Sequence, residues 1–374
     1  MDIDVSRIFE IDERNVLRKM AGHGISGLVN IGNTCYLNSA IQLLSNIRIF
    51  SLYFLSKQFE EDVAEEKDEI SFLKEWIILV HAMWEDSPDQ VPNCIVKPVS
   101  LKRSLGKFYP SYAGMQQQDG QEAVGVILDI LHKSLCYEAS IKPIIQNPNQ
   151  KLTHKEEITL KSINAWGKAF ENEFSIPVNL FYGQFYSQVK CDNCGFVSES
   201  FEPFNTLLLP IEKSCSTIYD CLENFSLSED IDADCGWACE SCKMKTSAKK
   251  KVTICKLPPI LIIAFKRFEF KMGSMFPVKI NSRVDFPLTD MKIGKLCEKP
   301  ADIYRKYDLT GVSNHLGGTF GGHYTAYTKN GNGRWYEYDD DSVREVKDVG
   351  TIVSNQAYVL IYESQDLDIS KIIS

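Results

Sequence analysis

The 374-residue chain lacks an excess of positive charge and lacks any long apolar run. Lysine and arginine together number 41, against 50 aspartate and glutamate residues, so the formal net charge is −9. A protein that binds a phosphate backbone needs a basic surface, and this charge therefore argues against a nucleic-acid partner. The longest apolar stretches, such as residues 260–265, are far too short to cross a bilayer. We expect neither nucleic-acid binding nor a membrane segment.

The N-terminal residues lack the basic start and the apolar core of a secretory signal, and they carry acids at Asp2 and Asp4 instead. The chain nevertheless has 12 cysteines. Without a secretory signal, reduced thiols are favoured over a disulfide scaffold. We expect an intracellular protein, cytoplasmic or nuclear, in which some of these thiols bind a metal or take part in catalysis.

Internal repeats and coiled-coil heptads are absent as well, and the hydrophobic pattern changes once along the chain. Apolar residues at helical spacing predict helices from Tyr36 onward, over 70–84 and over 116–132. Residues 86–114 are interrupted by Pro and Gly, and 140–160 are polar and suggest an exposed insertion. Helices followed by short alternating segments indicate an α+β fold with an antiparallel sheet. The expected strands are 185–189, 204–209, 251–254, 260–270, 307–312, 323–328, 334–338 and 357–362.

Cys35 follows a loop of small and polar residues, at the expected start of a helix. Asn33 or Thr34 is a suitable N-cap, which places Cys35 in the first turn. The N–H groups and partial positive charge of a helix N-terminus favour the nucleophilic thiolate, and the same donors can stabilise an oxyanion. A lone cysteine at such a position is more often a buried structural residue, so catalysis requires a base elsewhere in the chain.

His323 is the candidate base, because the sequence predicts a hairpin that brings it to a carboxylate. Residues 329–333 form a strong turn signal between two strand-like segments. A hairpin folded at Gly331 sets His323 opposite Asp339, which can orient one ring nitrogen while the other faces a thiol. Asp340 competes for that role if the turn slips by one residue. The simpler alternative is a surface hairpin with an acidic end.

Two C-x-x-C pairs, Cys191 with Cys194 and Cys239 with Cys242, have the spacing of a metal site. Four thiolates suit tetrahedral Zn²⁺, and a closed set of four ligands indicates a structural site. The gap between the pairs is wider than in a compact zinc ribbon, so we expect the pairs on two hairpins. Neither pair opens a helix in a βαβ setting, which disfavours a redox role, while four unrelated thiols are the remaining alternative. Cys235 is a nearby substitute ligand.

Five motifs in order resemble those of the ubiquitin-specific protease family of cysteine deubiquitinases. The resemblance spans roughly residues 25–364. In the Gln-Asp box and just after it there are two mild departures. The family usually has Ala where this chain has Gly120, and residues 123–124 also differ from the usual pattern. The motifs are the cysteine box at 27–39, the histidine box at 321–346, the Gln-Asp box at 117–122, the strand ending in Lys-Arg-Phe at 257–268 and the final strand at 357–363.

The resemblance implies a papain-like fold with thumb, fingers and palm subdomains. It makes residues 25–364 the catalytic domain, preceded by an arm at 1–24 and followed by a tail at 365–374. Within that domain it implies a helical thumb over about 25–140, zinc-binding fingers over about 181–256, and a palm made of about 165–180 and 257–364.

The resemblance also implies a role for individual residues. Cys35 matches the nucleophile, His323 the base and Asp339 the orienting residue, while Asn30 matches the oxyanion donor. Asp119 matches a position that contacts the C-terminal tail of ubiquitin, although a carboxylate there also suits the N-terminus of a helix. The full set of positions implied to line the tail channel is Gln117, Asp119, Phe268, Gly322 and Tyr324.

The function implied is thiol-dependent hydrolysis of the peptide or isopeptide bond after the C-terminal glycine of ubiquitin. The expected partners are ubiquitin, ubiquitinated proteins and activating or targeting proteins, and zinc is the expected cofactor. Three alternatives have weaker support. They are a ubiquitin-binding module without catalysis, a peptidase for another ubiquitin-like modifier, and a zinc-based nucleic-acid binder, which the acidic charge contradicts.

Overall fold

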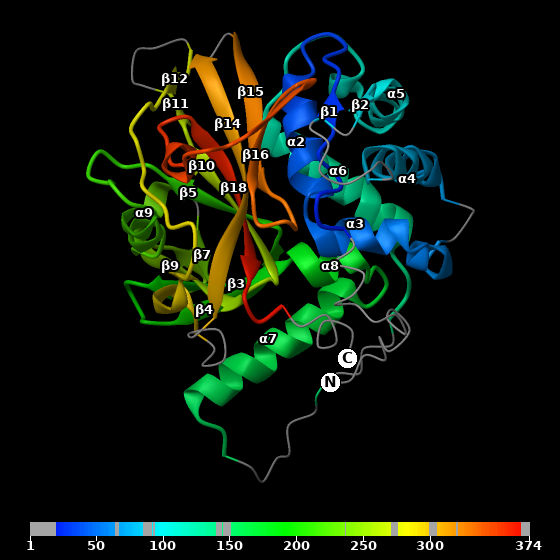
Figure 1. The fold of residues 1–374 in the computed structure, drawn as a ribbon. Helices are drawn as coiled ribbons and strands as arrows, with labels where there is room; N and C mark the ends of the chain where they lie inside the picture. Colours follow the sequence, from blue (N-terminus) through cyan, green and yellow to red (C-terminus); the bar gives the residue numbers. More distant parts are fainter. Residues whose placement is uncertain are drawn as a thin grey trace.

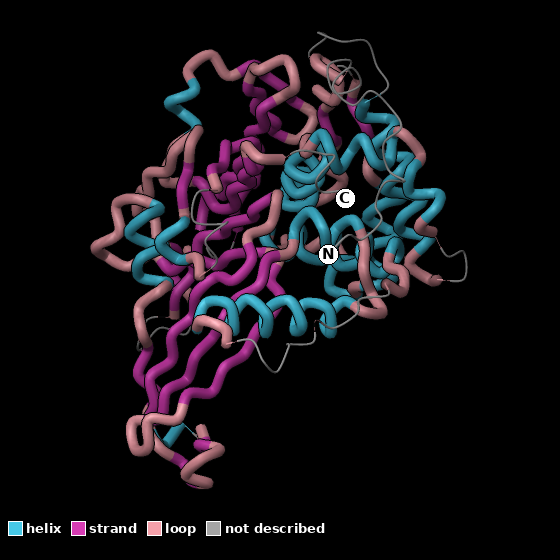
Figure 2. The backbone as a smooth tube through the Cα atoms, turned by 90° about the horizontal axis from the view of Figure 1, so that it is seen from below, coloured by secondary structure: helices cyan, strands magenta, loops and turns pink. Residues whose placement is uncertain are grey.

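A computed structural model describes residues 20–63, 67–84, 92, 94–139, 144, 151–235, 237–270, 276–298, 305–318 and 321–367. Most helices gather on one side of the molecule and most strands on the other, while α9 (Ile218–Phe225) lies on the strand side (Figures 1 and 2). The predicted α+β class is confirmed. Among the described residues, no helix has the length and apolar character needed to cross a membrane.

Five helices form the helical side, and their starts follow local sequence signals. The helix predicted over 70–84 is present with those bounds, whereas the one predicted from residue 116 begins at Gly120, because Asp119 is its N-cap. A helix over 99–108 was not predicted, since Pro98 stands at its N-cap and starts the helix rather than breaking it. The five are α2 (Cys35–Ser45), α3 (Arg48–Leu55), α4 (Ile70–Trp84), α5 (Val99–Phe108) and α6 (Gly120–Leu135).

A second helix missed by the hydrophobic pattern begins inside the segment that was expected to be an exposed insertion, 140–160, and continues beyond it to Phe170. Thr153 and Glu156 form a reciprocal capping box, a signal that is visible in the sequence. The remaining α-helices of the described residues are α7 (His154–Phe170), α8 (Ile176–Phe181) and α9 (Ile218–Phe225).

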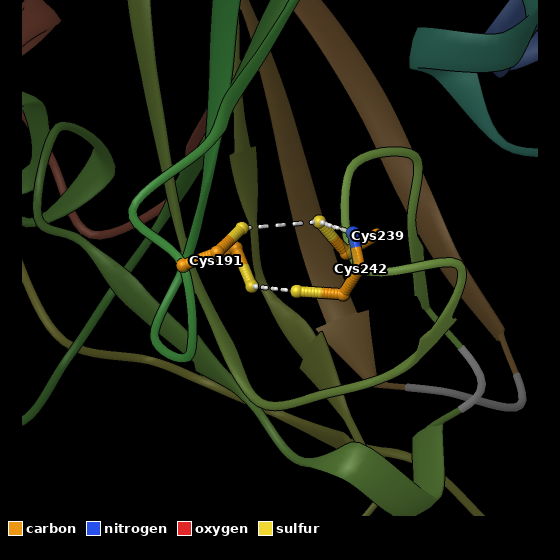
Figure 3. A group of neighbouring side chains, drawn as sticks. Cys191, Cys239 and Cys242 are labelled. Carbon is orange, nitrogen blue, oxygen red and sulfur yellow. Dashed lines mark hydrogen bonds between the residues drawn. The ribbon is translucent and has the colours of Figure 1, made fainter.

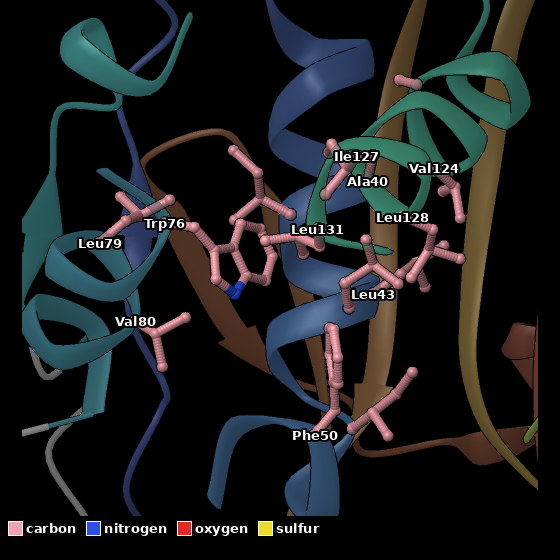
Figure 4. Packing of buried hydrophobic residues seen from close by; sticks show 14 of the residues in the cluster. Ala40, Leu43, Phe50, Trp76, Leu79, Val80, Val124, Ile127, Leu128 and Leu131 are labelled. Atoms are coloured by element: carbon pink, nitrogen blue, oxygen red, sulfur yellow. The ribbon is translucent and has the colours of Figure 1, made fainter. Parts of the chain in front are cut away.

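The helical side has a continuous aromatic and aliphatic core. Trp76 of α4 lies beside Phe50 of α3, with ring centroids 6.3 Å apart, and both are fully buried. Leu43 of α2 and Leu131 of α6 belong to the same buried cluster, shown in Figure 4. Side chains from four helices therefore fix the position of α2, the helix that begins with Cys35.

A large sheet forms the centre of the molecule (Figure 1). Its strands pair antiparallel, except that the edge strand β5 runs parallel to β10. Along the sheet the order is β17 (Ser342–Glu345), β16 (Trp335–Asp339), β15 (Gly321–Lys329), β14 (Lys306–Gly318), β18 (Ala357–Ser364), β10 (Ile260–Lys266) and β5 (Thr206–Pro210), and β13 (Met291–Lys292) pairs with β14.

Strand β10 explains why one part of the sequence is a continuous apolar run. Ile260, Ile262 and Ala264 belong to the core beneath the helices. The alternate residues Leu261 and Ile263 belong to a second buried cluster on the opposite face, which also contains residues of α9. A strand buried on both faces has no polar face and cannot show alternation.

A smaller sheet extends away from the central sheet and carries the cysteine pairs at its end. It consists of β4 (Val197–Phe204), β3 (Gly183–Cys191), β9 (Ala248–Lys256) and β6 (Glu229–Ile231), in that order. The other short strands form local pairs. They are β1 (Gly27–Leu28) with β2 (Ile95–Val96), β7 (Ala238–Cys239) with β8 (Met244–Lys245), and β11 (Phe268–Glu269) with β12 (Val278–Lys279).

We expect the doubly buried strand β10 to dominate stability. Replacement Ile262→Ala should lower the free energy of unfolding by about 2–5 kcal/mol, because it leaves a cavity in a packed core. The matched control is Ile78→Ala on α4, where the side chain is 62% exposed and the change should stay within about 0.5 kcal/mol. Urea unfolding of both variants measures the difference, and equal losses would contradict this account of the core.

Candidate active site

Cys35 is the first residue of α2, and the loop before it is tied back to Asn30. The Asn30 side-chain oxygen accepts from the N–H groups of Gly32 and Thr34, each at 3.1 Å. Gly32 has φ +118° and Asn33 has φ +52°, so the loop turns through the left-handed region just before the helix. Thr34 is the N-cap, but its side chain makes no capping hydrogen bond. The hydroxyl therefore does not compete with an anion for the first helical N–H groups.

His323 of β15 and Asp339 of β16 form a hydrogen-bonded pair. The imidazole Nε2 lies 2.6 Å from Asp339 Oδ1, and each side chain is 39% exposed. The predicted pairing differs in register, because Ala326 lies opposite Tyr338 and Asp339 therefore continues opposite Thr325. The hairpin thus folds one residue later than expected. A shift of two positions keeps both side chains on one face, where diagonal neighbours remain within reach.

Asp340 has a separate set of contacts. Its carboxylate accepts from the side-chain amides of Asn38 at 2.8 Å and Asn30 at 2.9 Å, and its φ is +52°. This turn directs the carboxylate toward α2 and its preceding loop. Asp339, the first of the two candidates, is therefore the hydrogen-bond partner of His323, while Asp340 holds the candidate oxyanion donor in place.

Gln117 connects the cysteine to the strand that carries the histidine. Its Nε2 lies 3.6 Å from Cys35 Sγ and also donates to the carbonyl of Gly322, while its Oε1 accepts from the Gly322 N–H at 3.1 Å. Gly322 directly precedes His323. Among the described residues no hydrogen bond joins Cys35 to His323, and such nucleophile–base contacts are often long before substrate binds.

The residues implied to line the tail channel meet where α6 approaches the central sheet. Asp119 Oδ1 accepts from the N–H groups of Gln121 and Glu122 at 2.7 and 3.2 Å. Its other oxygen accepts from the Tyr358 hydroxyl at 2.6 Å. The capping role of Asp119 is therefore present in the structure, and its contact with a substrate stays a prediction.

His315 and Tyr358 belong to this region, although sequence reasoning did not select them. The His315 ring lies 4.7 Å from that of Tyr324 and 5.6 Å from that of Phe268. Burial, with nearby Lys279, lowers the pKa of His315 to about 4, so its ring is neutral near pH 7. The available signal was the strand pattern alone, which does not give the register of β14 against β15.

The four predicted metal ligands lie together at the end of the smaller sheet. Figure 3 labels three of them, Cys191, Cys239 and Cys242. Cys191 and Cys242 have their sulfurs 3.9 Å apart, and Cys194 and Cys239 have theirs 3.7 Å apart. Tetrahedral zinc with bonds of about 2.3 Å places thiolates ~3.8 Å apart, so the quartet fits this ion. The side chain of Cys235 lies outside the described residues.

Two polar side chains support the sulfurs. Thr246 Oγ1 lies 3.3 Å from Cys191 Sγ, and Asn193 Nδ2 donates to Cys242 Sγ at 3.3 Å. Hydrogen bonds of this kind orient metal ligands and stabilise thiolate charge. The donor chemistry and the local hydrogen bonding therefore both suit a four-thiolate zinc site.

Comparison with known proteins gives the same family and fold. The family model described as ubiquitin carboxyl-terminal hydrolase matches residues 26–362. Ubiquitin carboxyl-terminal hydrolase 2 of Homo sapiens is 33% identical over 355 residues, which are 94% of this chain and 57% of that protein. Ubiquitin carboxyl-terminal hydrolase 4 of Vanderwaltozyma polyspora is 32% identical over 363 residues, covering 90% of this chain and 40% of that protein. The chain thus spans about half the length of the curated relatives it matches.

A solved structure supports the fold independently. The SAGA Ubp8/Sgf11/Sus1/Sgf73 DUB module bound to ubiquitin aldehyde matches with a TM-score of 0.69 at 23% identity, over 96% of this chain and 77% of that chain. The family model covers most of the chain, and the curated relatives exceed 30% identity over nearly its whole length. This chain belongs to the ubiquitin carboxyl-terminal hydrolase family.

Proposed function

We propose that the chain is a cysteine-type deubiquitinase that hydrolyses the bond after the C-terminal glycine of ubiquitin. The observation that carries the proposal is the arrangement at the start of α2. There the side chain of Gln117 contacts both the Cys35 thiol, at a helix N-terminus, and the backbone of β15. The same strand carries His323, which is hydrogen-bonded to a carboxylate. Family membership supplies the substrate class, because the matching family is described by its action on ubiquitin.

The mechanism follows from the chemistry of these groups. His323 takes the proton of Cys35, and the thiolate attacks the carbonyl carbon of the terminal glycine. The oxyanion forms near the first N–H groups of α2 and the Asn30 amide, which Asp340 holds at 2.9 Å. The imidazolium, held by Asp339, protonates the leaving amine. Water then attacks the thioester with His323 as base, which releases the carboxylate and restores the thiol.

The substrate tail would bind where the N-terminal end of α6 meets the central sheet, a place that we call the tail channel. Gly322 offers a backbone N–H and carbonyl, and the Gln117 amide pairs with both in the free protein. An extended peptide makes the same two kinds of hydrogen bond. Tyr324 and Phe268 add aromatic walls, so the tail channel suits residues without side chains. The residues proposed to line the tail channel are Gln117, Asp119, Phe268, Gly322 and Tyr324.

Zinc bound by Cys191, Cys194, Cys239 and Cys242 would hold together the loops at the end of the smaller sheet. With all four positions taken by thiolates, the ion has a structural role. We further propose a cytoplasmic or nuclear location, because cysteines that serve as a nucleophile and as metal ligands must stay reduced. Activating or targeting proteins are proposed as additional partners.

The first prediction concerns the nucleophile. A ubiquitin derivative with a C-terminal electrophile should label the wild type on Cys35, because that thiol attacks the terminal carbonyl. Cys35→Ala should abolish labelling and hydrolysis while it keeps the fold and ubiquitin affinity. Peptide mapping and a fluorogenic ubiquitin conjugate measure these outcomes. A folded wild type that stays unlabelled, or a Cys35→Ala variant that still hydrolyses, would contradict the proposal.

The second prediction uses two aspartates from one acidic run. Asp339→Asn should lower kcat by about 10²–10⁴, because the imidazole loses the carboxylate that orients it and stabilises its charge. Asp341 is exposed, so Asp341→Asn should change kcat less than about twofold. Steady-state hydrolysis of the ubiquitin conjugate compares the two. Similar rates for both variants would remove Asp339 from the mechanism.

The third prediction concerns the metal. Cys191→Ser should lower the zinc content of the purified protein, since a hydroxyl is a poor replacement for a thiolate ligand. Cys136→Ser changes a partly exposed thiol outside the quartet and should leave zinc unchanged. Metal analysis by mass spectrometry decides the case, and equal zinc in both variants and the wild type would count against the site.

A further inference from the structure

Gly120 stands where the family motif usually has alanine. In this structure there is no room for the methyl group of an alanine at this position. It is the first residue of α6 and is buried. It is not among the glycines with positive φ, so its backbone conformation is open to any residue. Glycine at this position therefore cannot be explained by a turn.

The ring of Tyr324 occupies the place of the missing methyl group. A Cβ on Gly120 would lie 2.7 Å from Tyr324 Cε1 and 3.0 Å from Cδ1. Carbon atoms in contact normally stay about 3.5–4.0 Å apart, so an alanine here requires the ring or the helix to move. The third close atom is Tyr324 Cζ at 3.4 Å, so the edge of the ring lies directly against the first residue of the helix.

The helix end is also held by hydrogen bonds to the sheet. Asp119 caps the helix with one carboxylate oxygen and accepts the Tyr358 hydroxyl with the other, at 2.6 Å. Gln117, just before it, pairs with both backbone groups of Gly322. A methyl group on residue 120 therefore meets a helix end that is already bound to two strands of the sheet.

The ring is also enclosed on its other sides. Tyr324 is 4% exposed, and its ring lies 4.7 Å from His315 and 6.4 Å from Tyr358. An extra methyl on Gly120 would consequently separate α6 from β15 or displace the Tyr324 ring from its packed position. Either movement changes the spacing between the start of α6 and β15, which form the two sides of the tail channel.

We propose that Gly120 sets the width of the tail channel by giving the Tyr324 ring its place against the N-terminus of α6. The inference deepens the proposed function and rests on it. Gly120 is then a positioning residue that acts through Tyr324 on the fit of the substrate tail, while the reaction of the Cys35 thiol with small reagents does not depend on it. Substrates that thread an extended tail depend on Gly120, and reagents that bypass the channel do not.

The experiment compares two reagents on the full chain. Gly120→Ala should slow labelling of Cys35 by the ubiquitin electrophile by about tenfold or more, because displacements near 1 Å at a binding site have effects of this size. Alkylation of Cys35 by iodoacetamide should stay within about twofold of the wild-type rate. The control is Gly125→Ala in the same helix, where a Cβ meets nothing within 4 Å and both rates should remain unchanged.

A second background tests the contact itself and serves if Gly120→Ala alone does not fold. Tyr324→Val removes the ring atoms that the methyl would strike. Adding Gly120→Ala to Tyr324→Val should change the ubiquitin labelling rate by less than about twofold, since the two changes share one contact and cannot act independently. A further tenfold loss in the double variant would overturn the inference.

The remaining outcomes separate this inference from the proposed function. A Gly120→Ala variant that labels with ubiquitin as fast as the wild type overturns the inference and leaves the function intact. Equal slowing with both reagents also overturns it, because the damage would then lie at the thiol. A wild type that reacts with iodoacetamide but not with the ubiquitin electrophile removes the proposed function, and the inference with it.

Discussion

The packing of α2 against β14 and β15 is the contact on which the rest of the site depends. The helix and the two strands are far apart in the chain, yet Ser39 Oγ lies 2.6 Å from Ser313 Oγ and also donates to the carbonyl of Thr325 at 3.3 Å. Gly311 allows the close approach, because a Cβ there would lie 2.8 Å from Leu43 Cδ2. Buried polar contacts of this kind fix one register between helix and sheet, so the thiol is held in one position relative to the strand of the histidine.

Much of this arrangement follows from the sequence alone. The apolar run of β10, the start of α2 at Cys35 and the spacing of the four cysteines each had one dominant physical explanation, and the structure agrees with them. The predicted hairpin has His323 and Asp339 on the same face, as the structure does, although its turn was predicted one residue early and its strand pairing therefore differs by two positions. Period-two alternation makes such a prediction tolerant of a shift by two positions.

Other parts of the site depend on pairings that a single sequence does not encode. Tyr358 was recognised only as part of a final strand, and its bond to Asp119 requires the position of α6 over β18. Asp340 was considered a rival of Asp339, because sequence distance cannot distinguish a carboxylate that faces the imidazole from one that turns toward Asn30 and Asn38. The positive φ of Asp340 separates the two roles. The missed helix α5 shows that proline can begin a helix as well as end one.

The connections between the two sheets have a mechanical consequence. Strands β4 and β9 both pair with β3 in the smaller sheet, and the chain passes directly from β4 into β5 and from β9 into β10. Because β5 and β10 pair with each other, the smaller sheet is anchored to the central one by two adjacent strands rather than by a single flexible tether. The smaller sheet should therefore keep a fixed orientation relative to the central sheet. Loss of order around the four cysteines would then affect the loops at that end of the smaller sheet, while the angle between the two sheets would not change.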